Sequence, residues 1–104
     1  MLVEVVHMKN YGKVSKDLDG GGVYIYCGRP SVLGNPYYMA GEAQRLDVIS
    51  KCSQDVKWNE TLDDFVKWVD SCDYSVVKLG CFCAPKPCHC DLIKDRLNSE
   101  FNSK

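Results

Sequence analysis

The sequence predicts one α/β domain over residues 1–104, with a small, mostly parallel sheet of three to four strands and about three helices, Rossmann-like in character. Short segments rich in β-branched and aromatic residues are interspersed with longer segments whose apolar residues recur at helical spacing. The length of 104 residues suits a single domain, and 45% apolar with 26% charged residues is an ordinary globular composition.

Strands are expected at residues 2–7, 23–27 and 75–79, where Val, Ile, Tyr and Cys favour an extended, buried backbone. The segment 10–22 lies between the first two strands and contains four glycines. Glycine clusters are typical of turns and loops, so this segment is predicted to be irregular.

Three helices are expected from the apolar spacing. Thr61-Leu-Asp-Asp64 has the form of a capping box at the start of the second helix, and Pro87 suits the first position of the third. Residues 98–104 are expected to be a frayed tail. The apolar residues that would face the core recur at spacings of three or four: Leu46, Ile49, Cys52 and Val56; Leu62, Phe65, Val66 and Val69; Ile93, Leu97 and Phe101.

The charge balance bears on the class of partner. The chain has 13 basic and 14 acidic residues and a net charge of −1, which argues against an extended nucleic-acid surface. A single bound nucleotide needs only one or two cations and stays compatible with this balance. No apolar run approaches the ~20 residues of a membrane span, so no membrane partner is expected.

The cysteines bear on the cellular compartment. Seven is an odd number, and four of the seven lie within ten residues, which does not suit a closed disulfide framework. The first seven residues also lack the basic flank of a secretory signal. We therefore expect a cytoplasmic protein with reduced or metal-bound thiols.

The segment Cys81-Phe-Cys-Ala-Pro-Lys-Pro-Cys-His-Cys-Asp91 predicts a metal site. Zinc takes thiolate and imidazole ligands tetrahedrally, and four ligands suffice. Cys81 and Cys83 would point the same way on a continued strand, and Cys88 and His89 follow across a short loop. These four residues are the predicted ligands of a zinc ion, although the Cys-x-x-Cys knuckle is absent.

Two other interpretations of this segment stay open. A cysteine at a helix start faces free backbone N–H groups and the positive end of the helix dipole, which favours a reactive thiolate at Cys88 or Cys90 with His89 as proton acceptor. The same helix start, which includes Asp91, would also bind a phosphate. A buried thiol can instead serve only as a small apolar side chain, the role expected for Cys27, Cys52 and Cys72.

A second group of polar residues lies in Gly28-Arg-Pro-Ser-Val-Leu-Gly-Asn-Pro36, whose glycines and prolines fix a shaped loop. Arg29 offers a planar fork of donors for phosphate or carboxylate, and Ser31 and Asn35 add neutral hydrogen-bonding groups. The Walker and dinucleotide patterns are absent, and a loop that only turns the chain is the alternative. The predicted ligand-binding residues are Gly28, Arg29, Ser31, Asn35 and Asp91.

The two polar segments each follow a predicted strand. In parallel α/β sheets, ligands bind beyond the carboxyl ends of the strands. We therefore expect loop 28–36 and the turn 81–91 to form one pocket.

The two segments together resemble a family of small phage and bacterial proteins classed as a domain of unknown function. Its pattern is Gly-Arg-Pro-Ser-x-Leu-Gly-Asn-Pro, then Cys-x-Cys-x-Pro-x-x-Cys-His-Gly-Asp, and the resemblance spans roughly residues 23–97. The resemblance implies that both loops belong to one site and that the chain has a phage or prophage origin. Cys90 stands where the pattern has Gly, which implies a dispensable residue or an added ligand. The residues that match the pattern are Arg29, Asn35, Cys81, Cys83, Cys88, His89 and Asp91.

Two functional hypotheses follow. The first is a domain that binds a nucleotide-like or otherwise phosphorylated small molecule between loop 28–36 and the turn 81–91, with transfer or hydrolysis chemistry if it is an enzyme. The alternative is a non-enzymatic interaction module with a structural zinc site, acting on a host protein in the host cytoplasm if the chain is phage-encoded. A closed four-ligand metal sphere favours the alternative, and an open cleft favours the first hypothesis.

Overall fold

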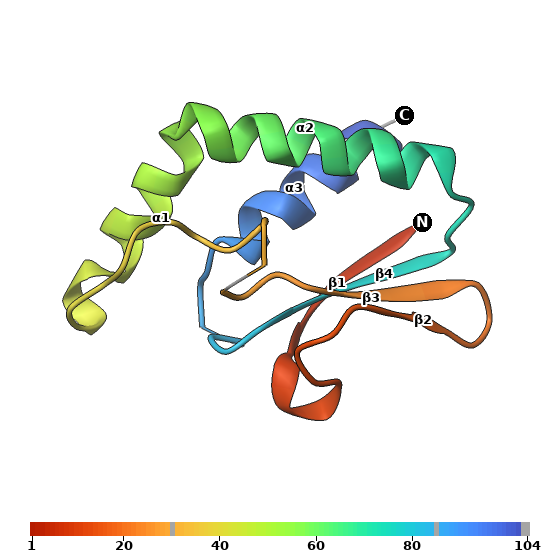
Figure 1. The fold of residues 1–104 in the computed structure, drawn as a ribbon, viewed down its shortest axis with the longest axis horizontal. Helices are drawn as coiled ribbons and strands as arrows, with labels where there is room; N and C mark the ends of the chain where they lie inside the picture. Colours follow the sequence, from red (N-terminus) through yellow and green to blue (C-terminus); the bar gives the residue numbers. More distant parts are fainter. Residues whose placement is uncertain (30, 85, 103–104) are drawn as a thin grey trace.

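The predicted α/β class is confirmed in the computed structural model, which describes residues 1–29, 31–84 and 86–102. The sheet contains β1 (Leu2–His7), β2 (Lys16–Leu18), β3 (Gly22–Tyr26) and β4 (Val76–Cys81). The helices are α1 (Arg45–Gln54), α2 (Val56–Ser71) and α3 (Cys90–Phe101), with short 3-10 turns η1 (Met8–Asn10) and η2 (Glu42–Gln44). Figure 1 shows α2 and α3 lying across one side of the sheet, with α1 extending from its edge.

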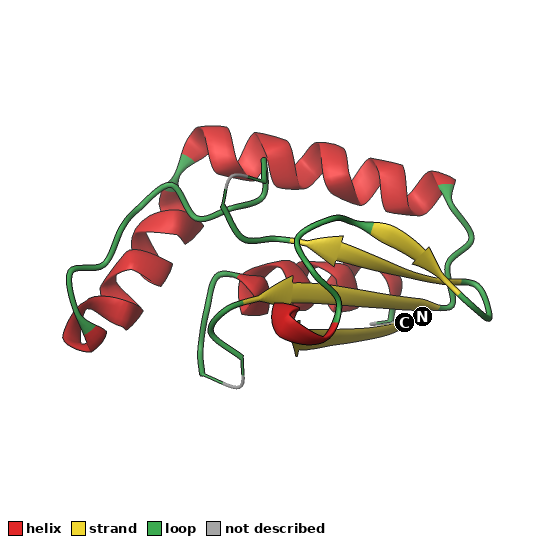
Figure 2. Ribbon diagram, turned by 60° about the horizontal axis from the view of Figure 1, so that its bottom comes forward, coloured by secondary structure: helices red, strands yellow, loops and turns green. Residues whose placement is uncertain are grey.

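The sheet has the strand order β1-β4-β3-β2. β4 pairs in parallel with both β1 and β3, and β2 pairs antiparallel with β3 at the edge (Figure 2). The prediction of a loop throughout 10–22 was wrong for β2, whose polar residues give little strand signal because they lie exposed at the sheet edge. Gly20 and Gly21 adopt positive φ angles of 77° and 82°, which allows the tight turn between β2 and β3.

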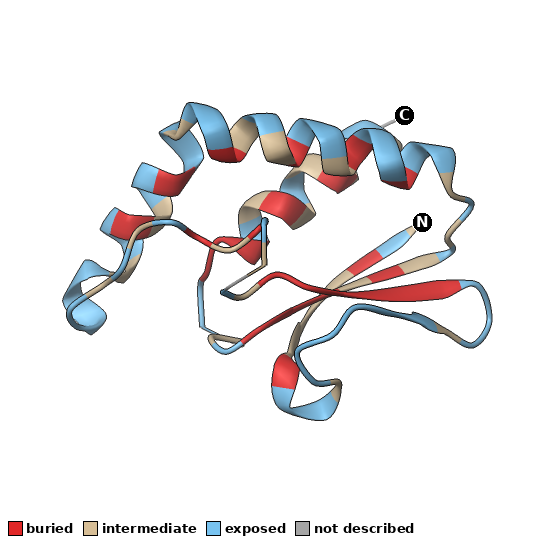
Figure 3. Ribbon diagram, viewed as in Figure 1, coloured by how far each residue is buried: buried red, intermediate tan, exposed pale blue. Residues whose placement is uncertain are grey.

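The two faces of the sheet carry different cores. Alternate residues of β3 and β4 point to opposite faces, so Val23, Ile25, Val77 and Leu79 pack against the helices. The opposite face buries Tyr24 and Tyr26 with Met8 of η1. Figure 3 shows β3 buried along its whole length between these two layers. In the described part of the chain, the α-helices pack on one face of the sheet. A Rossmann fold has helices on both faces, so the similarity to it is limited to the parallel strands.

Helix α2 begins earlier than predicted. The side chain of Asp55 accepts a hydrogen bond of 2.8 Å from the backbone N–H of Trp58 and caps the helix. Thr61 lies inside α2 and donates to the carbonyl of Lys57, so the prediction of a capping box there was wrong. The predicted apolar stripe of α2 is confirmed: Leu62, Val66 and Val69 are buried, and Phe65 packs against them half-buried.

Helices α1 and α3 also differ from expectation. Because α1 ends at Gln54, the predicted period does not continue to Val56; Leu46 and Val56 are exposed, and Val48 and Cys52 are buried. Helix α3 begins at Cys90 and not at Pro87. It continues to Phe101, so the part of the predicted tail up to residue 101 is helical, and residues 103–104 lie outside the described residues.

None of the helices in the described part of the chain is long and apolar enough to span a bilayer.

Candidate functional site

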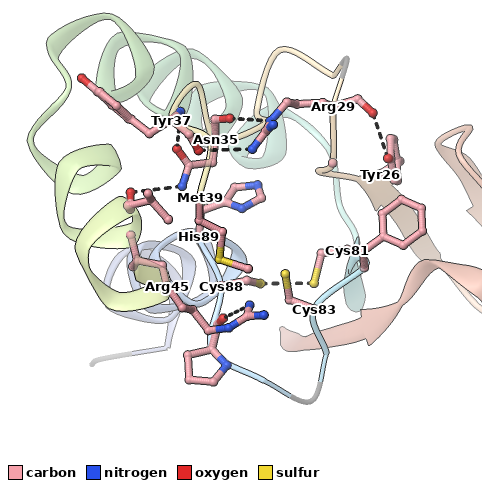
Figure 4. Close-up of a pocket in the computed structure, with 15 residues that line it drawn as sticks. Tyr26, Arg29, Asn35, Tyr37, Met39, Arg45, Cys81, Cys83, Cys88 and His89 are labelled. Atoms are coloured by element: carbon pink, nitrogen blue, oxygen red, sulfur yellow. Dashed lines mark hydrogen bonds between the residues drawn. The ribbon is translucent and has the colours of Figure 1, made fainter. Parts of the chain in front are cut away.

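A pocket of about 300 Å³ opens beyond the carboxyl ends of β3 and β4. The described residues that line it come from three parts of the chain: the end of β3 and the loop that follows it, the first half of α1, and the end of β4 with the segment that follows it (Figure 4). The two polar segments meet because β3 and β4 are parallel neighbours whose ends lie at one edge of the sheet. Both Arg29 and His89 therefore face the same cavity.

Arg29 is held in the pocket wall by neutral partners. Its Nε donates to the carbonyl of Asn35 at 2.9 Å, and one terminal nitrogen donates to the carbonyl of Tyr37 at 3.2 Å. Its guanidinium lies 3.6 Å from the ring centroid of Tyr38. Among the described residues no carboxylate forms an ion pair with Arg29. Its positive charge is thus fixed in place without being neutralised.

Asn35 and Ser31 hold the loop in shape. The Asn35 side chain is buried; its amide donates to the carbonyl of Val48, and its oxygen accepts from the backbone N–H of Tyr37. Ser31 Oγ accepts from the backbone N–H of Leu33. Asn35 lines the pocket, but its side chain is engaged in joining the loop to α1, and Ser31 is not part of the pocket wall.

Arg45, at the start of α1, supplies the second guanidinium of the pocket. It forms a two-point ion pair with Glu42 and donates to the carbonyl of Pro87 at 3.0 Å. Hydrogen bonds to Glu42 and to the thiol of Cys83 raise the pKa of Arg45 above its usual value. Arg45 therefore joins α1 to the segment after β4, and its charge is largely balanced by Glu42.

Three buried thiols converge behind this wall. The sulfur atoms of Cys81, Cys88 and Cys90 lie within 4.8 Å of one another, and those of Cys81 and Cys88 are 3.1 Å apart. Cys81 ends β4, whereas Cys88 and Cys90 stand at the start of α3. Three sulfur atoms at this spacing are a set that can bind a metal ion, because thiolates are strong ligands of zinc and similar ions.

The surroundings favour a thiolate at Cys81. Contacts with the thiol of Cys88, and then with that of Cys90, lower the pKa of Cys81 well below its usual range. The backbone N–H groups of Cys83 and Ala84 point at the same sulfur and act in the same direction. The pKa values of Cys88 and Cys90 are raised, first of all because each donates its proton to a neighbouring thiol. The contacts within the cluster thus favour Cys81 as the thiol that loses its proton first.

His89 is buried and faces away from the sulfur atoms. Its Nε2 lies 2.6 Å from the carbonyl oxygen of Cys27. A carbonyl only accepts, so Nε2 carries the proton and Nδ1 is left as an acceptor. Burial lowers the pKa of His89, which keeps the ring neutral. The ring packs edge-on against Trp58, with centroids 6.5 Å apart.

Asp91 caps the start of α3 and does not line the pocket. Its carboxylate accepts from the backbone N–H of Cys88 at 3.1 Å, and its own N–H donates to the Cys88 carbonyl. The first bond satisfies a backbone N–H just before α3, and the second closes an ordinary backbone turn. Asp91 is exposed and is not among the residues that line the pocket, so its role in ligand binding stays a prediction.

The grouped ligand atoms differ from the predicted metal set. Cys81 and Cys88 belong to the cluster, but Cys83 lies beside Arg45 and His89 bonds to Cys27. The prediction assumed that β4 continues to Cys83, whereas the strand ends at Cys81 and the chain turns. The third sulfur atom of the cluster belongs to Cys90, which stands where the family pattern has Gly. Arg45 was also missed, since its helical position gives no sign that it reaches this edge.

Comparison with known proteins places the chain in a family. Searches of curated proteins and of solved structures found no match. A family model for a domain of unknown function, DUF4326, matches residues 12–99, a range that contains both pocket-forming segments and the thiol cluster. With most of its length matched, the chain belongs to the DUF4326 family.

Proposed function

We propose that this domain binds a small phosphorylated, nucleotide-like molecule in the pocket beyond β3 and β4, with Arg29 contacting the phosphate. The observation that carries the proposal is the state of Arg29: two backbone carbonyls fix its guanidinium, and no carboxylate of the described residues pairs with it. A guanidinium has five N–H donors, and within the described part of the chain two of those of Arg29 are engaged. The remaining edge suits the two-point contact that arginine makes with phosphate.

The other lining residues support an anionic ligand with an apolar part. Within the described residues, the pocket lining contains two arginines, Arg29 and Arg45, and no aspartate, glutamate or lysine. Met39, Val48 and Ile49 form an apolar wall, against which a base or similar flat group would pack. Nδ1 of His89 offers an acceptor for an N–H or O–H of the ligand. A volume of about 300 Å³ is at the lower end for ligand pockets, so the ligand is a small molecule and not a polymer.

A thermal-shift screen tests this proposal with inorganic phosphate, nucleoside monophosphates and sugar phosphates. We expect at least one phosphorylated compound to raise the melting temperature of the wild type and of Arg96→Gln, but not of Arg29→Gln. Arg96 is a suitable control because it is an arginine of α3 that pairs with Asp63 and Glu100 on the surface, away from the pocket. Equal stabilisation of all three proteins would contradict the role of Arg29.

A second candidate function is a structural zinc site, favoured by the sulfur atoms of Cys81, Cys88 and Cys90. Zinc–sulfur bonds of about 2.3 Å in a tetrahedron place sulfur atoms about 3.8 Å apart, which lies between the 3.1 Å that separates Cys81 and Cys88 and the 4.8 Å within which all three sulfur atoms fall. Such a site would tie the end of β4 to the start of α3, as in an interaction module. Elemental analysis of protein purified without chelators tests this candidate: one zinc per chain is expected, and its absence after zinc addition and desalting would contradict it.

A further inference from the structure

The buried Cys27 lies at the carboxyl end of β3, beside the thiol cluster. Tyr26 of β3 pairs in parallel register with Gly80 of β4, so Cys27 stands next to Cys81 one residue further along. The backbone N–H of Cys27 donates to the Gly80 carbonyl at 2.9 Å and continues the ladder. Residues paired across parallel strands point to the same face, so both thiols face the helix layer.

The thiol of Cys27 also lies near the cluster: it packs in the same buried core as the three grouped thiols, and its proximity raises the pKa of the Cys90 thiol. Cys27 and Cys90 are both fully shielded from solvent, and Cys81 and Cys88 are nearly so. Four sulfur atoms from three elements, β4, α3 and the end of β3, are therefore gathered in one dry region. Cys27 stands outside the tighter group of three, and its S–H points to the carbonyl of Ile25 at 3.4 Å.

The other candidates for a fourth ligand are engaged elsewhere. The thiol of Cys83 is hydrogen-bonded to Arg45 on the pocket side, and Nε2 of His89 is bonded to the Cys27 carbonyl. A structural zinc ion is held by four protein ligands, so three thiolates leave one position to fill. Turning the Cys27 side chain away from Ile25 would break only a weak thiol hydrogen bond, which leaves its sulfur able to reorient within the core that it shares with the other three.

We propose that Cys27 is the fourth ligand, so that Cys27, Cys81, Cys88 and Cys90 enclose one zinc ion in a closed tetrathiolate site. The inference rests on the zinc site proposed above and extends it. On binding, each thiol that still carries a proton releases it to solvent, and four sulfur–zinc bonds form. The negative charge on the sulfur atoms is offset in part by backbone N–H groups: those of Cys83 and Ala84 point to Cys81, and that of Cys90 points to Cys88.

The closed site would have a structural consequence for the pocket. Gly28 and Arg29 follow Cys27 directly, and Cys88 and His89 form the opposite wall. A zinc ion bound by Cys27 and Cys88 would therefore fix the two walls relative to each other. It would offer no open coordination position, so the metal would shape the pocket without taking part in chemistry there.

Cobalt(II) substitution tests the proposal, because sulfur-to-cobalt charge transfer grows with the number of bound thiolates. We expect the wild type to bind one cobalt with the spectrum of a tetrahedral, all-sulfur site. Cys27→Ser should lose about a quarter of the charge-transfer intensity, from four thiolates to three. Cys52→Ser and Cys83→Ser are the controls and should keep the full spectrum; Cys52 is as completely buried as Cys27 but lies on α1.

The outcomes separate the two proposals. If the wild type binds no cobalt or zinc, the zinc site itself is wrong. If it binds the metal and Cys27→Ser keeps the full spectrum, only the fourth ligand is wrong. X-ray absorption of the zinc-loaded wild type gives the same answer without a variant: four sulfur neighbours at about 2.3 Å support Cys27, whereas three sulfur atoms with one nitrogen or oxygen overturn it.

Discussion

The sulfur atoms of Cys81 and Cys88 lie 3.1 Å apart, one at the end of β4 and the other just before α3. The contact joins two residues seven positions apart in the chain, and it connects the sheet to a helix that packs on it. A thiolate at Cys81 next to a thiol at Cys88 is an arrangement that either a metal ion or an oxidant would engage.

Metal removal should separate the cluster cysteines from the other cysteines. We expect a chelator to lower the melting temperature of the zinc-loaded protein, because binding energy at a structural site adds to the folding energy. Cys90→Ser should abolish the chelator effect, and Cys83→Ser should retain it, since only Cys90 belongs to the sulfur group. Differential scanning fluorimetry with and without chelator measures both, and the opposite pattern would restore Cys83 to the ligand set.

Oxidation of the metal-free protein should join Cys81 to Cys88. With diamide as oxidant, the two thiols lose two protons and two electrons, form one disulfide, and reduce diamide to its hydrazine. Peptide mapping after alkylation should find this pair linked and Cys72, at the far end of α2, alkylated. Zinc loading should prevent the reaction. A disulfide that joins Cys83 to either partner would show that the chain after β4 is arranged differently.

The free energy of unfolding should depend on pH through Asp55, the N-cap of α2. Hydrogen bonds from the Trp58 N–H and then the Tyr37 hydroxyl lower the pKa of Asp55 below its usual value. A carboxyl with a lowered folded pKa stabilises the protein above about pH 4 and loses that contribution as the pH falls through the folded value. Asp55→Asn keeps a capping side chain without the charge.

Urea unfolding from about pH 6 to about pH 3 tests this dependence. The difference in unfolding free energy between wild type and Asp55→Asn should be largest at pH 6 and shrink toward acid. Asp64→Asn, on an exposed aspartate of the same helix, is the control. A difference that stays constant over this range would contradict a lowered pKa at Asp55.

A side chain at Gly80 should disturb the sheet next to the pocket. A Cβ at this position would overlap the ring and hydroxyl of Tyr24, which is fully buried and donates to the Gly12 carbonyl at 2.7 Å. We expect Gly80→Ala to lower the free energy of unfolding by about 1–3 kcal/mol, as overpacked cores do. Gly41→Ala, where nothing lies within 4 Å, should be close to neutral. Denaturant titration of both variants checks the contrast.

The sequence predicted those elements whose signal is local. Composition predicted β1, β3 and β4 because all three are rich in β-branched and aromatic residues, although β1, at the sheet edge, buries only Val3. β2 was missed because its exposed Lys16 and Asp17 gain strand structure only by pairing with β3. Asp55 was missed as the N-cap of α2 because Thr61, six residues later, also looks like the start of a helix. Tertiary packing decides which of two such N-cap candidates begins the helix.

The candidate site was predicted less completely, because it depends on which strands are neighbours. That two loops share a pocket follows from parallel strands, but the register that sets Cys27 beside Cys81 cannot be deduced from one sequence. The same limit applies to Arg45, which reaches the Pro87 carbonyl from a helix 42 positions earlier in the chain. That contact forms because the start of α1 packs near the segment after β4, and this packing is a tertiary arrangement that the sequence of α1 does not reveal.

The most direct test of the account follows the Arg29 side chain during a titration with inorganic phosphate. In a proton–nitrogen correlation spectrum at constant ionic strength, the Nε–H signal of Arg29, assigned from its loss in Arg29→Lys, should shift and saturate. The signal of Arg96, which is paired with Asp63 and Glu100, should not move. An Arg29 signal that stays fixed while signals elsewhere shift would contradict anion binding in this pocket.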